Sequence, residues 1–321
     1  MPLLEIKDLC IDFRMGGKPV RAVDGISLAI EPGEVVCLVG ESGSGKSVTA
    51  LSVTRLLPED TVRYAGGSIR LEGRDVLGLG ETELNRIRGG VAGYVFQEPG
   101  ASLNPVIRVG NQIHEVLRRH RPGEARPEEV VRLLQRVGIP APERRARDFP
   151  HQFSGGMQQR VAIAMALAAR PKLLIADEPT TALDVTIQAQ ILDLLRELQG
   201  QLGMSILLIT HNLGIVGGIA DRLLVMYAGQ IVEAGPAAEV LARPKHPYTR
   251  CLIRSVPSLD ADVERLTAIP GAVPRLGAWP GGCRFHPRCP VARETCGQRE
   301  PSLESAAEGI RHEVRCPHWN S

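Results

Sequence analysis

The sequence has few aromatic side chains and almost no net charge. Its 321 residues include 5 Phe, 4 Tyr and 2 Trp, and 38 Lys and Arg against 36 Asp and Glu leave a formal net charge of +2. So few aromatic side chains disfavour a surface on which nucleic-acid bases stack, and a balanced charge gives no overall field for nucleic acid or acidic lipid. A hydrophobic content of 43% excludes a disordered chain. We therefore expect a folded protein that has no nucleic-acid partner.

Long apolar runs are absent as well. No stretch approaches the roughly 18 consecutive apolar residues of a membrane-spanning helix. The first ten residues carry Glu5 and Asp8 and lack the apolar core of a signal peptide. We expect a chain that does not cross a membrane by itself and that lies in a reducing compartment. In such a compartment the seven cysteines would be thiols or metal ligands rather than disulfides.

Short apolar runs alternate with longer helical patterns, which predicts a doubly wound α/β core. The expected buried strands are Glu34–Val39, Gly93–Phe96, Leu173–Asp177, Ser205–Thr210 and Leu223–Tyr227, and the expected helices are Lys46–Leu57, Gly155–Ala169 and Thr186–Gln199. Residues 107–137 read as an inserted helical region, part of a helical subdomain at about 97–170. After Ala242, Pro and Gly become dense and strand patterns stop, so we place a domain boundary there, between 1–242 and 243–321.

A phosphate-binding loop is the strongest local pattern. An apolar strand is followed by Gly40-Glu-Ser-Gly-Ser-Gly-Lys46-Ser47 and then by a helix, which is the G-x-x-x-x-G-K-[ST] pattern in its required context. Its glycines let successive backbone N–H groups wrap a β-phosphate. Lys46 would supply a point charge to the β- and γ-phosphates, and Ser47 an oxygen to Mg²⁺. A chance glycine-rich turn is the alternative interpretation.

The second half of a nucleotide site is predicted where an apolar strand ends in Asp177-Glu178. Asp177 could hold hydrated Mg²⁺, and Glu178 could act as general base on the attacking water. His211 ends the following predicted strand and is expected to contact the γ-phosphate. Alone, Asp177-Glu178 could be an ordinary capped turn. Likewise, Ser154-Gly-Gly could be a plain helix cap, although its free N–H groups suit a second anion site.

These motifs together resemble the ATP-binding cassette (ABC) transporter ATPases over roughly residues 3–242. The resemblance implies a P-loop ABC-type nucleotide-binding domain, with ATP bound between the phosphate loop of one subunit and the Ser154–Gln158 signature of its partner. Phe13 matches the aromatic residue that stacks on adenine, with a core residue as the alternative. Gln97 matches the loop that touches Mg²⁺ and water, and Asp184 the loop that communicates between the two ATP sites.

The expected site residues fall into three groups. The catalytic residues are Glu178 and His211. The nucleotide-binding residues are Phe13, Gly40, Glu41, Ser42, Gly43, Ser44, Gly45, Lys46, Ser47, Val48, Gln97, Ser154, Gly155, Gly156, Gln158 and Asp184, and the Mg²⁺ ligands are Ser47, Gln97 and Asp177. Nothing in these motifs departs from a hydrolysis-competent pattern.

Two further segments resemble the ATPases of oligopeptide and dipeptide importers. They are 97–105, Gln-Glu-Pro-Gly-Ala-Ser-Leu-Asn-Pro, and 245–250, Lys-His-Pro-Tyr-Thr-Arg, which continues into a C-terminal extension similar to that of this group. The resemblance implies ATP-driven import of di- and oligopeptides. Systems for nickel, glutathione, oligosaccharides and antimicrobial peptides share much of the extension and remain alternatives. A non-transport ABC ATPase acting on nucleic acid or ribosomes is disfavoured, because the chain has one cassette and no heptads.

The extension also concentrates cysteine, as Cys283-x5-Cys289-x6-Cys296-x19-Cys316. No C-x2–4-C pair typical of structural zinc occurs among them, and four thiolates in a loop-rich segment suit an iron–sulfur cluster. Matching cysteines in the peptide-importer extension imply a [4Fe–4S] cluster; zinc and free or disulfide-bonded thiols are the alternatives. The histidines near enough to replace a ligand are His286, His312 and His318. Cys10, Cys37 and Cys251 are expected to be inert core residues.

The family resemblance also implies the partners. We expect a second ABC ATPase subunit, a heterodimer being favoured over a homodimer, together with two transmembrane permeases and, indirectly, an extracytoplasmic peptide-binding protein. The chain would then be a peripheral protein at the cytoplasmic face of the inner membrane. ATP and Mg²⁺ are the expected substrate and cofactor of the cassette.

Overall fold

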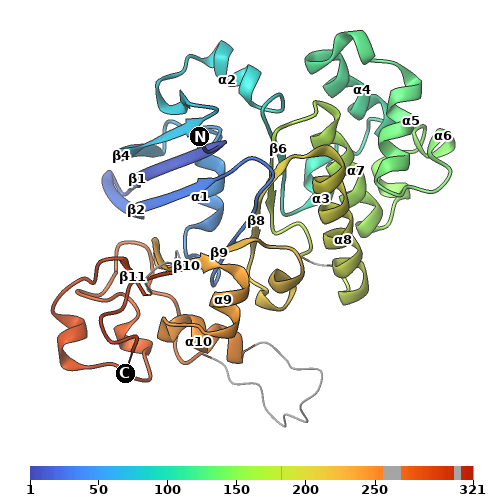
Figure 1. Cartoon of the computed structure of the whole chain (residues 1–321). Helices are drawn as coiled ribbons and strands as arrows, with labels where there is room; N and C mark the ends of the chain where they lie inside the picture. The colour runs from blue at the N-terminus through green and yellow to red at the C-terminus, as the bar shows by residue number, and fades with distance from the viewer. Residues whose placement is uncertain (182, 256–268, 307–311, 321) are drawn as a thin grey trace. The chain divides into compact units, whose positions relative to one another are not determined.

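The computed structural model describes residues 1–181, 183–255, 269–306 and 312–320 (Figure 1). Its contacts group the chain into two compact units. We call them the helical unit, made of Met1, 31–34 and 78–208, and the phosphate-loop unit, made of 2–30, 35–77 and 209–321. The predicted boundary near residue 242 stays a prediction, and part of the predicted extension (256–268, 307–311 and 321) lies outside the described residues.

The phosphate-loop unit contains an antiparallel sheet that the sequence pattern did not predict. Its strands are β1 (Leu4–Met15), β2 (Lys18–Ile30), β4 (Val62–Leu71) and β5 (Arg74–Asp75), in the order β2-β1-β4-β5. Along β1, buried side chains such as Leu4, Ile6, Leu9 and Ile11 are separated by partly or fully exposed ones. One face of this sheet is therefore buried and the other is open, as is common for antiparallel sheets.

A second group of strands in this unit supports the phosphate loop. β3 (Val35–Val39) is fully buried and pairs in parallel with β9 (Arg222–Tyr227), and β10 (Gln230–Pro236) pairs antiparallel with β9. The strands predicted at 34–39 and 223–227 are thus confirmed. The expectation that strands stop after residue 242 is wrong, because β12 (Glu313–Val314) pairs with β10 and β11 (Glu304–Ser305) pairs with β12. Figure 1 draws β11 in dark red close to β10.

Three α-helices complete the described part of this unit: α1 (Lys46–Ser52), α9 (Ala237–Ala242) and α10 (Pro247–Arg254). The helix predicted at 46–57 ends five residues early. Arg55 takes a left-handed conformation with φ 50°, and the Leu56 N–H returns to the Leu51 carbonyl. This is the hydrogen-bond geometry that closes helices, so the apolar residues that follow leave the helix axis.

The helical unit is built on parallel strands. β6 (Ala92–Val95) pairs with β7 (Leu173–Asp177), and β8 (Ser205–Thr210) begins in this unit. These three strands confirm the ones predicted at 93–96, 173–177 and 205–210. All five residues of β7 and all six of β8 are buried, which is why continuous apolar runs marked them.

Helices make up the rest of the described helical unit. They are α2 (Glu81–Ile87), α3 (Pro99–Ser102), α4 (Val109–His120), α5 (Pro127–Arg136), α6 (Pro142–Arg145), α7 (Gly155–Ala168) and α8 (Val185–Leu202). Short 3-10 helices in the described residues of the two units cover Val76–Gly78, Pro122–Glu124, Pro150–Gln152, Leu213–Gly218, His286–Arg288 and Glu294–Gly297. The helices predicted at 155–169 and 186–199 and the helical region at 107–137 are confirmed. α7 packs against α3, α4, α5 and β6, so it is buried on several sides.

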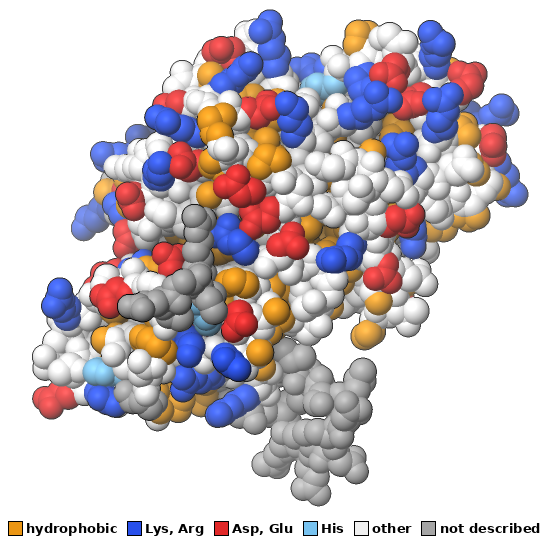
Figure 2. Space-filling view, viewed as in Figure 1, with side chains coloured by type: hydrophobic (Ala, Val, Ile, Leu, Met, Phe, Trp, Pro, Cys, Tyr) orange, Lys and Arg blue, Asp and Glu red, His pale blue; other side chains and the backbone are white. Residues whose placement is uncertain are grey.

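The charges on the surface follow the composition. Figure 2 shows Lys and Arg side chains intermingled with Asp and Glu over the face in view, in keeping with the net charge of +2. No described helix is both long and apolar enough to cross a lipid bilayer.

A fully buried carboxylate fixes the start of the predicted extension on β10. Glu233 has no exposed surface. It accepts hydrogen bonds from the backbone N–H groups of Lys245 (2.6 Å) and His246 (2.9 Å), and its Oε1 lies 2.8 Å from His312 Nε2. His246 then begins α10, because its Nδ1 accepts the Tyr248 N–H at 3.1 Å. A buried carboxylate requires such partners, since leaving it unpaired costs several kcal/mol.

The stability of the fold should fall in mild acid because of His246. Burial lowers the pKa of His246 from 6.5 to about 4, despite the opposing field of Glu233. The folded chain therefore keeps His246 neutral while the unfolded chain takes up a proton below pH 6.5. The contribution of His246 to the free energy of unfolding is therefore complete above pH 6.5. It decreases by about 3 kcal/mol as the pH falls from 6.5 to 4.

The matched variant is His246→Asn, whose side-chain oxygen can still cap α10. Unfolding free energies of both proteins would be measured by denaturant titration from pH 7 to pH 4. We expect the wild-type advantage over the variant to shrink by about 3 kcal/mol across this range. Parallel stability curves would show that His246 does not titrate in this way.

Candidate active site and cysteine cavity

The predicted phosphate loop, 40–47, connects β3 to α1 within the phosphate-loop unit. Its first residue, Gly40, passes so close to β9 that a Cβ atom there would overlap the Met226 carbonyl oxygen. Gly45, which precedes α1, has φ 105°, a conformation that residues with side chains rarely adopt. Glycine is therefore required at both ends of the loop by its own backbone path.

Two polar side chains within the loop are buried. Lys46 is 4% exposed, and its Nζ donates to the carbonyl oxygens of Gly40 (2.8 Å) and Glu41 (3.0 Å). The Ser44 hydroxyl is also buried and makes no hydrogen bond with any group in the described part of the chain. Because buried hydroxyls are nearly always paired, this one fits an added phosphate oxygen. The loop thus carries two buried donors, the Lys46 ammonium and the Ser44 hydroxyl.

Other predicted residues of this unit lie at the surface or half-buried. Phe13 is half-buried on β1, opposite Val20 of β2. Val48 and Ser47 are half-buried in the first turn of α1, and Ser42 and Gly43 are exposed at the tip of the loop. His211 is exposed directly after β8. Phe13 is accordingly not a core residue and remains accessible for stacking.

The helical unit holds the two predicted acids at the end of β7. Asp177 is buried and accepts a hydrogen bond from the Tyr94 hydroxyl of β6 at 2.9 Å. Glu178 has φ 48°, a left-handed conformation that costs a residue with a side chain about 1–3 kcal/mol. Its Oε2 accepts from Gln97 Nε2 at 3.2 Å and from the Thr181 hydroxyl at 2.9 Å. Strain of this kind clusters at functional sites, where neighbours hold it in place.

The structure therefore brings Gln97 into contact with Glu178. It also places Tyr94, which was not among the predicted site residues, in contact with Asp177. Burial and the nearby Asp177 charge raise the pKa of Tyr94 well above its usual range, so it stays a hydrogen-bond donor. The only sequence signal for it was its place on a predicted strand, next to the strand that carries Asp177.

The predicted signature, 154–158, begins α7 in the same unit. Ser154 caps the helix by accepting the Met157 N–H at 3.4 Å, and both Ser154 and Gly155 are exposed. A Cβ on Gly156 would lie 2.7 Å from a methyl group of Ile187, so the start of α7 approaches α8 closely. Gln158 is tied to the Pro150 carbonyl at 2.9 Å.

Asp184 caps α8 with its carboxylate, which accepts the Ile187 N–H at 3.0 Å. It is exposed, and so is the neighbouring Val185, at 82%. Ser154, Gly155, Asp184 and Val185 therefore form an exposed surface, which we call the signature surface, where the starts of α7 and α8 meet.

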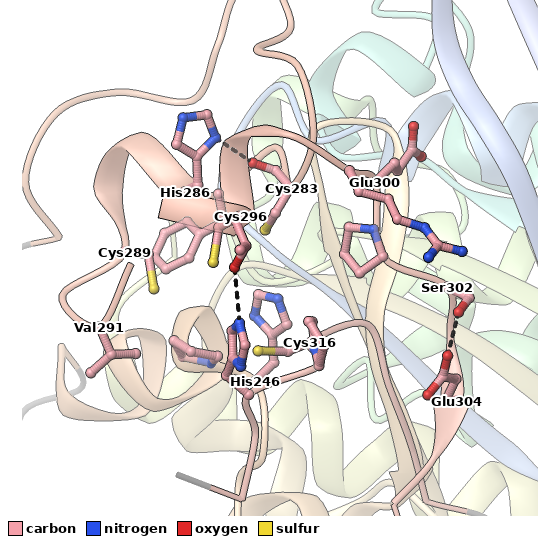
Figure 3. Close-up of a pocket in the computed structure, with 17 residues that line it drawn as sticks. His246, Cys283, His286, Cys289, Val291, Cys296, Glu300, Ser302, Glu304 and Cys316 are labelled. Carbon is pink, nitrogen blue, oxygen red and sulfur yellow. Dashed lines mark hydrogen bonds between the residues drawn. The ribbon is translucent and has the colours of Figure 1, made fainter. Parts of the chain in front are cut away.

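The four late cysteines line one cavity of about 360 Å³ in the phosphate-loop unit (Figure 3). Cys283, Cys289, Cys296 and Cys316 border it, and Figure 3 shows their sulfur atoms around the same space. None of the seven cysteines is joined by a disulfide in the structure. Burial raises the pKa of Cys283 and Cys316, and that of Cys289 to about 11.

The predicted metal site is not confirmed. Within the described residues, no three His, Cys, Asp or Glu side chains are grouped so that they could hold a metal ion. Of the predicted substitute ligands, His286 and His318 line the cavity, whereas His312 does not and instead contacts Glu233. His246, which was not among the predicted ligands, lines it too.

The three remaining cysteines only partly match the expectation of inert core residues. Cys37 is fully buried in β3. Cys10 is half-buried, and its sulfur accepts the Gly25 N–H at 3.3 Å. Cys251 is half-buried in α10. Two of the three are therefore half-buried rather than core residues.

Comparison with known families gives two matches along the chain. The profile of the ABC transporter family matches residues 23–181. The profile described as oligopeptide/dipeptide transporter, C-terminal region, matches residues 232–296. The first match includes the phosphate loop, the signature and the Asp177-Glu178 pair, and the second includes three of the four late cysteines.

Similar proteins match over nearly the whole chain. A putative peptide import ATP-binding protein of Brucella ovis is 53% identical over 331 positions, covering 99% of this chain and 97% of that protein. A second protein of the same description, from Brucella abortus, is 50% identical over 304 positions, covering 94% and 91%.

Solved structures with the same fold are ABC cassettes. A dimeric ATP-binding cassette in a post-hydrolysis state with ADP and phosphate has a TM-score of 0.65 and 29% identity, covering 73% of this chain and 98% of that one. A cassette of Clostridium perfringens, part of an ABC transporter complex, has a TM-score of 0.65 and 30% identity, covering 75% and 91%. Both support the predicted α/β cassette fold.

The hydrogen bond from Tyr94 to Asp177 is expected to affect Mg²⁺ binding. Tyr94→Phe removes the hydroxyl that orients Asp177 and keeps the ring that packs 4.4 Å from Phe96. Losing a partner that orients a metal ligand typically weakens metal binding 10- to 100-fold. We expect the Mg²⁺ concentration for half-maximal ATP hydrolysis to rise about tenfold, measured by Mg²⁺ titration at saturating ATP. An unchanged Mg²⁺ requirement would mean that Asp177 does not need this hydroxyl for metal binding.

Proposed function

The chain belongs to the ABC transporter family of ATPases, in the group that carries the oligopeptide/dipeptide C-terminal region, and from this premise we propose that it hydrolyses ATP to drive the import of di- and oligopeptides. The observation that carries the proposal is the full-length similarity to peptide import ATP-binding proteins, at 53% identity over 99% of the chain. The peptide would cross the membrane through partner permeases, and the chain would supply the ATP-driven step.

Hydrolysis is assigned to the residues that the motifs selected. The phosphate loop binds the triphosphate, with Lys46 and the buried Ser44 hydroxyl as donors. Asp177 and Ser47 hold Mg²⁺, with Asp177 oriented by Tyr94. Glu178 acts as general base on the attacking water; its carboxylate is held by Gln97 and Thr181. His211 contacts the γ-phosphate. Mg²⁺ would neutralise the charge that develops on the phosphate oxygens.

A dimer supplies the rest of each site. The signature surface is exposed and contains both the Ser154 cap of α7 and the Asp184 cap of α8. These features suit a contact with the nucleotide bound by another subunit, because the start of α7 presents N–H groups to an anion. A second, different ABC ATPase is the favoured partner. ATP then stabilises the closed dimer by binding it more tightly than the open one.

We assign permease docking to the segment that follows β6. A cavity of about 220 Å³ in the helical unit is lined mainly by apolar groups, among them Phe96, Val116 and Met165. Phe96 is 45% exposed and directly precedes Gln97, whose side chain holds Glu178. An apolar-tipped permease helix seated here would move Gln97 and so change the position of the general base. This arrangement supports coupling between transport and hydrolysis.

The chain would act as a peripheral subunit at the cytoplasmic face of the inner membrane. An extracytoplasmic binding protein would deliver the peptide to the permeases, so this chain would not contact the peptide itself. We keep 243–321 as the transporter-type extension, which agrees roughly with the family match at 232–296.

An iron–sulfur cluster remains a proposal for the extension. Four free cysteines line one cavity, and four cysteine thiolates are the usual ligands of a [4Fe–4S] cluster. Such a cluster is larger than one ion, so its ligands need not converge on a point. Cys283, Cys289, Cys296 and Cys316 would hold it, after deprotonation of thiols whose burial now favours the neutral form. When bound, it would supply a covalent cross-link between these loops and a one-electron redox centre.

The general-base assignment is tested with Glu178→Gln. The amide keeps the size of the side chain and cannot accept a proton, so turnover should fall by at least 100-fold while ATP binding is preserved. ATP should then hold the closed dimer, which size-exclusion chromatography with and without ATP would detect. Normal turnover in this variant would remove Glu178 from the role of base.

Transport itself is tested with the chain reconstituted beside its permeases and second ATPase in proteoliposomes. Uptake of labelled di- and oligopeptides that requires ATP and an intact Glu178 is the expected result. ATP-dependent uptake of nickel or glutathione, with none of peptide, would replace the proposed substrate while keeping the ATPase assignment.

The cluster is tested by analysis of protein purified without oxygen. We expect iron and acid-labile sulfide in equal amounts, about four of each per chain, with a broad visible absorbance that is lost in Cys289→Ser. Stoichiometric zinc without sulfide would contradict the cluster and favour the zinc alternative.

A further inference from the structure

The segment from Cys283 to Cys289 has two faces. Its end residues, Cys283 and Cys289, line the cysteine cavity. The residues just inside them, Arg284 and Arg288, extend away from that cavity, to groups around the phosphate loop. Phe285, 1% exposed, packs between these faces against the rings of Tyr227 and Tyr248. All of these residues belong to the phosphate-loop unit.

Arg288 binds the carboxylate of Glu41, the second residue of the phosphate loop. Its Nη1 donates to Glu41 Oε1 at 3.0 Å and its Nη2 to Glu41 Oε2 at 2.9 Å, a two-point contact between guanidinium and carboxylate. The Arg288 side chain is 6% exposed and that of Glu41 is 28% exposed. The Nε of Arg288 is fixed by the Pro270 carbonyl at 2.8 Å. This planar fork matches a carboxylate in a way that lysine cannot.

The backbone of the same loop is held by the extension and by the turn between β9 and β10. The Glu41 N–H donates to the Tyr248 hydroxyl of α10 at 2.8 Å. The Gly229 N–H donates to the Ser44 carbonyl at 2.9 Å. The preceding carbonyl, that of Ala228, accepts Arg284 Nη1 at 2.6 Å. Glu41 is thus fixed both at its side chain and at its backbone, 247 and 207 positions before its partners in the sequence.

The contact between Arg288 and Glu41 is important because Glu41 carries a negative charge close to the predicted phosphate site. Lys46, which is expected to contact the β- and γ-phosphates, donates to the Glu41 carbonyl at 3.0 Å, so the Glu41 residue borders the phosphate site. An uncompensated carboxylate there would repel the polyphosphate and compete for Lys46. The fork of Arg288 neutralises this charge and directs the carboxylate toward the extension.

We propose that Arg288 is a positioning residue of the ATP site, which holds the Glu41 carboxylate away from the phosphates and keeps the phosphate loop in its binding shape. The inference rests on the proposed binding of ATP by 40–47, and it deepens that proposal by making the C-terminal extension part of the site. Arg288 does not touch the nucleotide; it acts through Glu41. The contact requires no metal in the cysteine cavity.

The test compares ATP affinity in the full-length protein by titration calorimetry. Arg288→Met should raise the Kd for ATP about tenfold, which corresponds to about 1.4 kcal/mol. Arg288→Lys, which keeps the charge and loses the fork, should raise it less, by about threefold. The control Arg254→Met, an exposed arginine on α10 of the same extension, should bind ATP like the wild type.

A double-mutant cycle separates positioning from general structural damage. In a Glu41→Gln background, Arg288→Met should change the Kd for ATP less than twofold, because no carboxylate remains to be held. A tenfold loss in that background as well, or Arg288→Met binding ATP like the wild type, would overturn the inference. If Arg288→Met fails to fold, as judged by circular dichroism, Arg288→Lys in both backgrounds gives the same comparison.

Lys46→Ala keeps the two proposals distinguishable. We expect it to abolish ATP binding while Arg288→Met only weakens it. If Lys46→Ala binds ATP like the wild type, the assignment of ATP to 40–47 fails. If Lys46→Ala loses binding but Arg288→Met does not, ATP binding by the loop stands and the role of Arg288 fails.

Discussion

The buried carboxylate of Glu233 is the interaction on which the arrangement of the C-terminal extension depends. A carboxylate without exposed surface must be paired, and its three described partners are the backbone N–H groups of Lys245 and His246 and the ring of His312. Each of these lies beyond β10 in the sequence, so the chain has to return to β10. Once it does, His246 caps α10, and the first turn of α10 places the Tyr248 hydroxyl within 2.8 Å of the Glu41 N–H. A charge in the core thereby determines which groups reach the phosphate loop.

The helical unit depends on a different constraint, the left-handed backbone of Glu178. This conformation is unfavourable for glutamate, and the hydrogen bonds from Gln97 and Thr181 to the Glu178 carboxylate help to hold it. Gln97 lies in the loop after β6, where Phe96 is half exposed beside an apolar cavity. A group bound at that cavity could therefore alter the hydrogen bond of Gln97 without touching Glu178 itself. In the proposed coupling, a permease bound at Phe96 would therefore affect the general base through the neighbouring residue, Gln97.

The elements that could be predicted from the sequence are those whose structure depends on the residues of one short segment alone. β7 and β8 are buried on both faces, so their apolar runs are continuous, and the phosphate loop has glycines at positions where its own backbone requires them. The β1, β2 and β4 strands were missed because only one of their faces is buried, which leaves polar residues among the apolar ones. β11 and β12 have two residues each, too few for any periodicity. Tyr94 and Arg288 could not be predicted for another reason: their partners Asp177 and Glu41 are 83 and 247 positions away, and only the folded chain brings them together.

The two-faced segment from Cys283 to Cys289 changes how the extension should be understood. The dense Pro and Gly after Ala242 predicted a separate domain there, yet the residues beside two of its cysteines contact the phosphate loop and the turn that supports it. The segment is short, and the buried Phe285 and a 3-10 turn lie between its cysteines and its arginines' contacts with the phosphate-loop region. A displacement of Cys289 in the cavity would shift the Arg288 fork relative to Glu41, and a two-point contact tolerates little displacement because both hydrogen bonds are directional. The cysteine cavity and the phosphate loop are therefore connected through one segment of seven residues, 283–289.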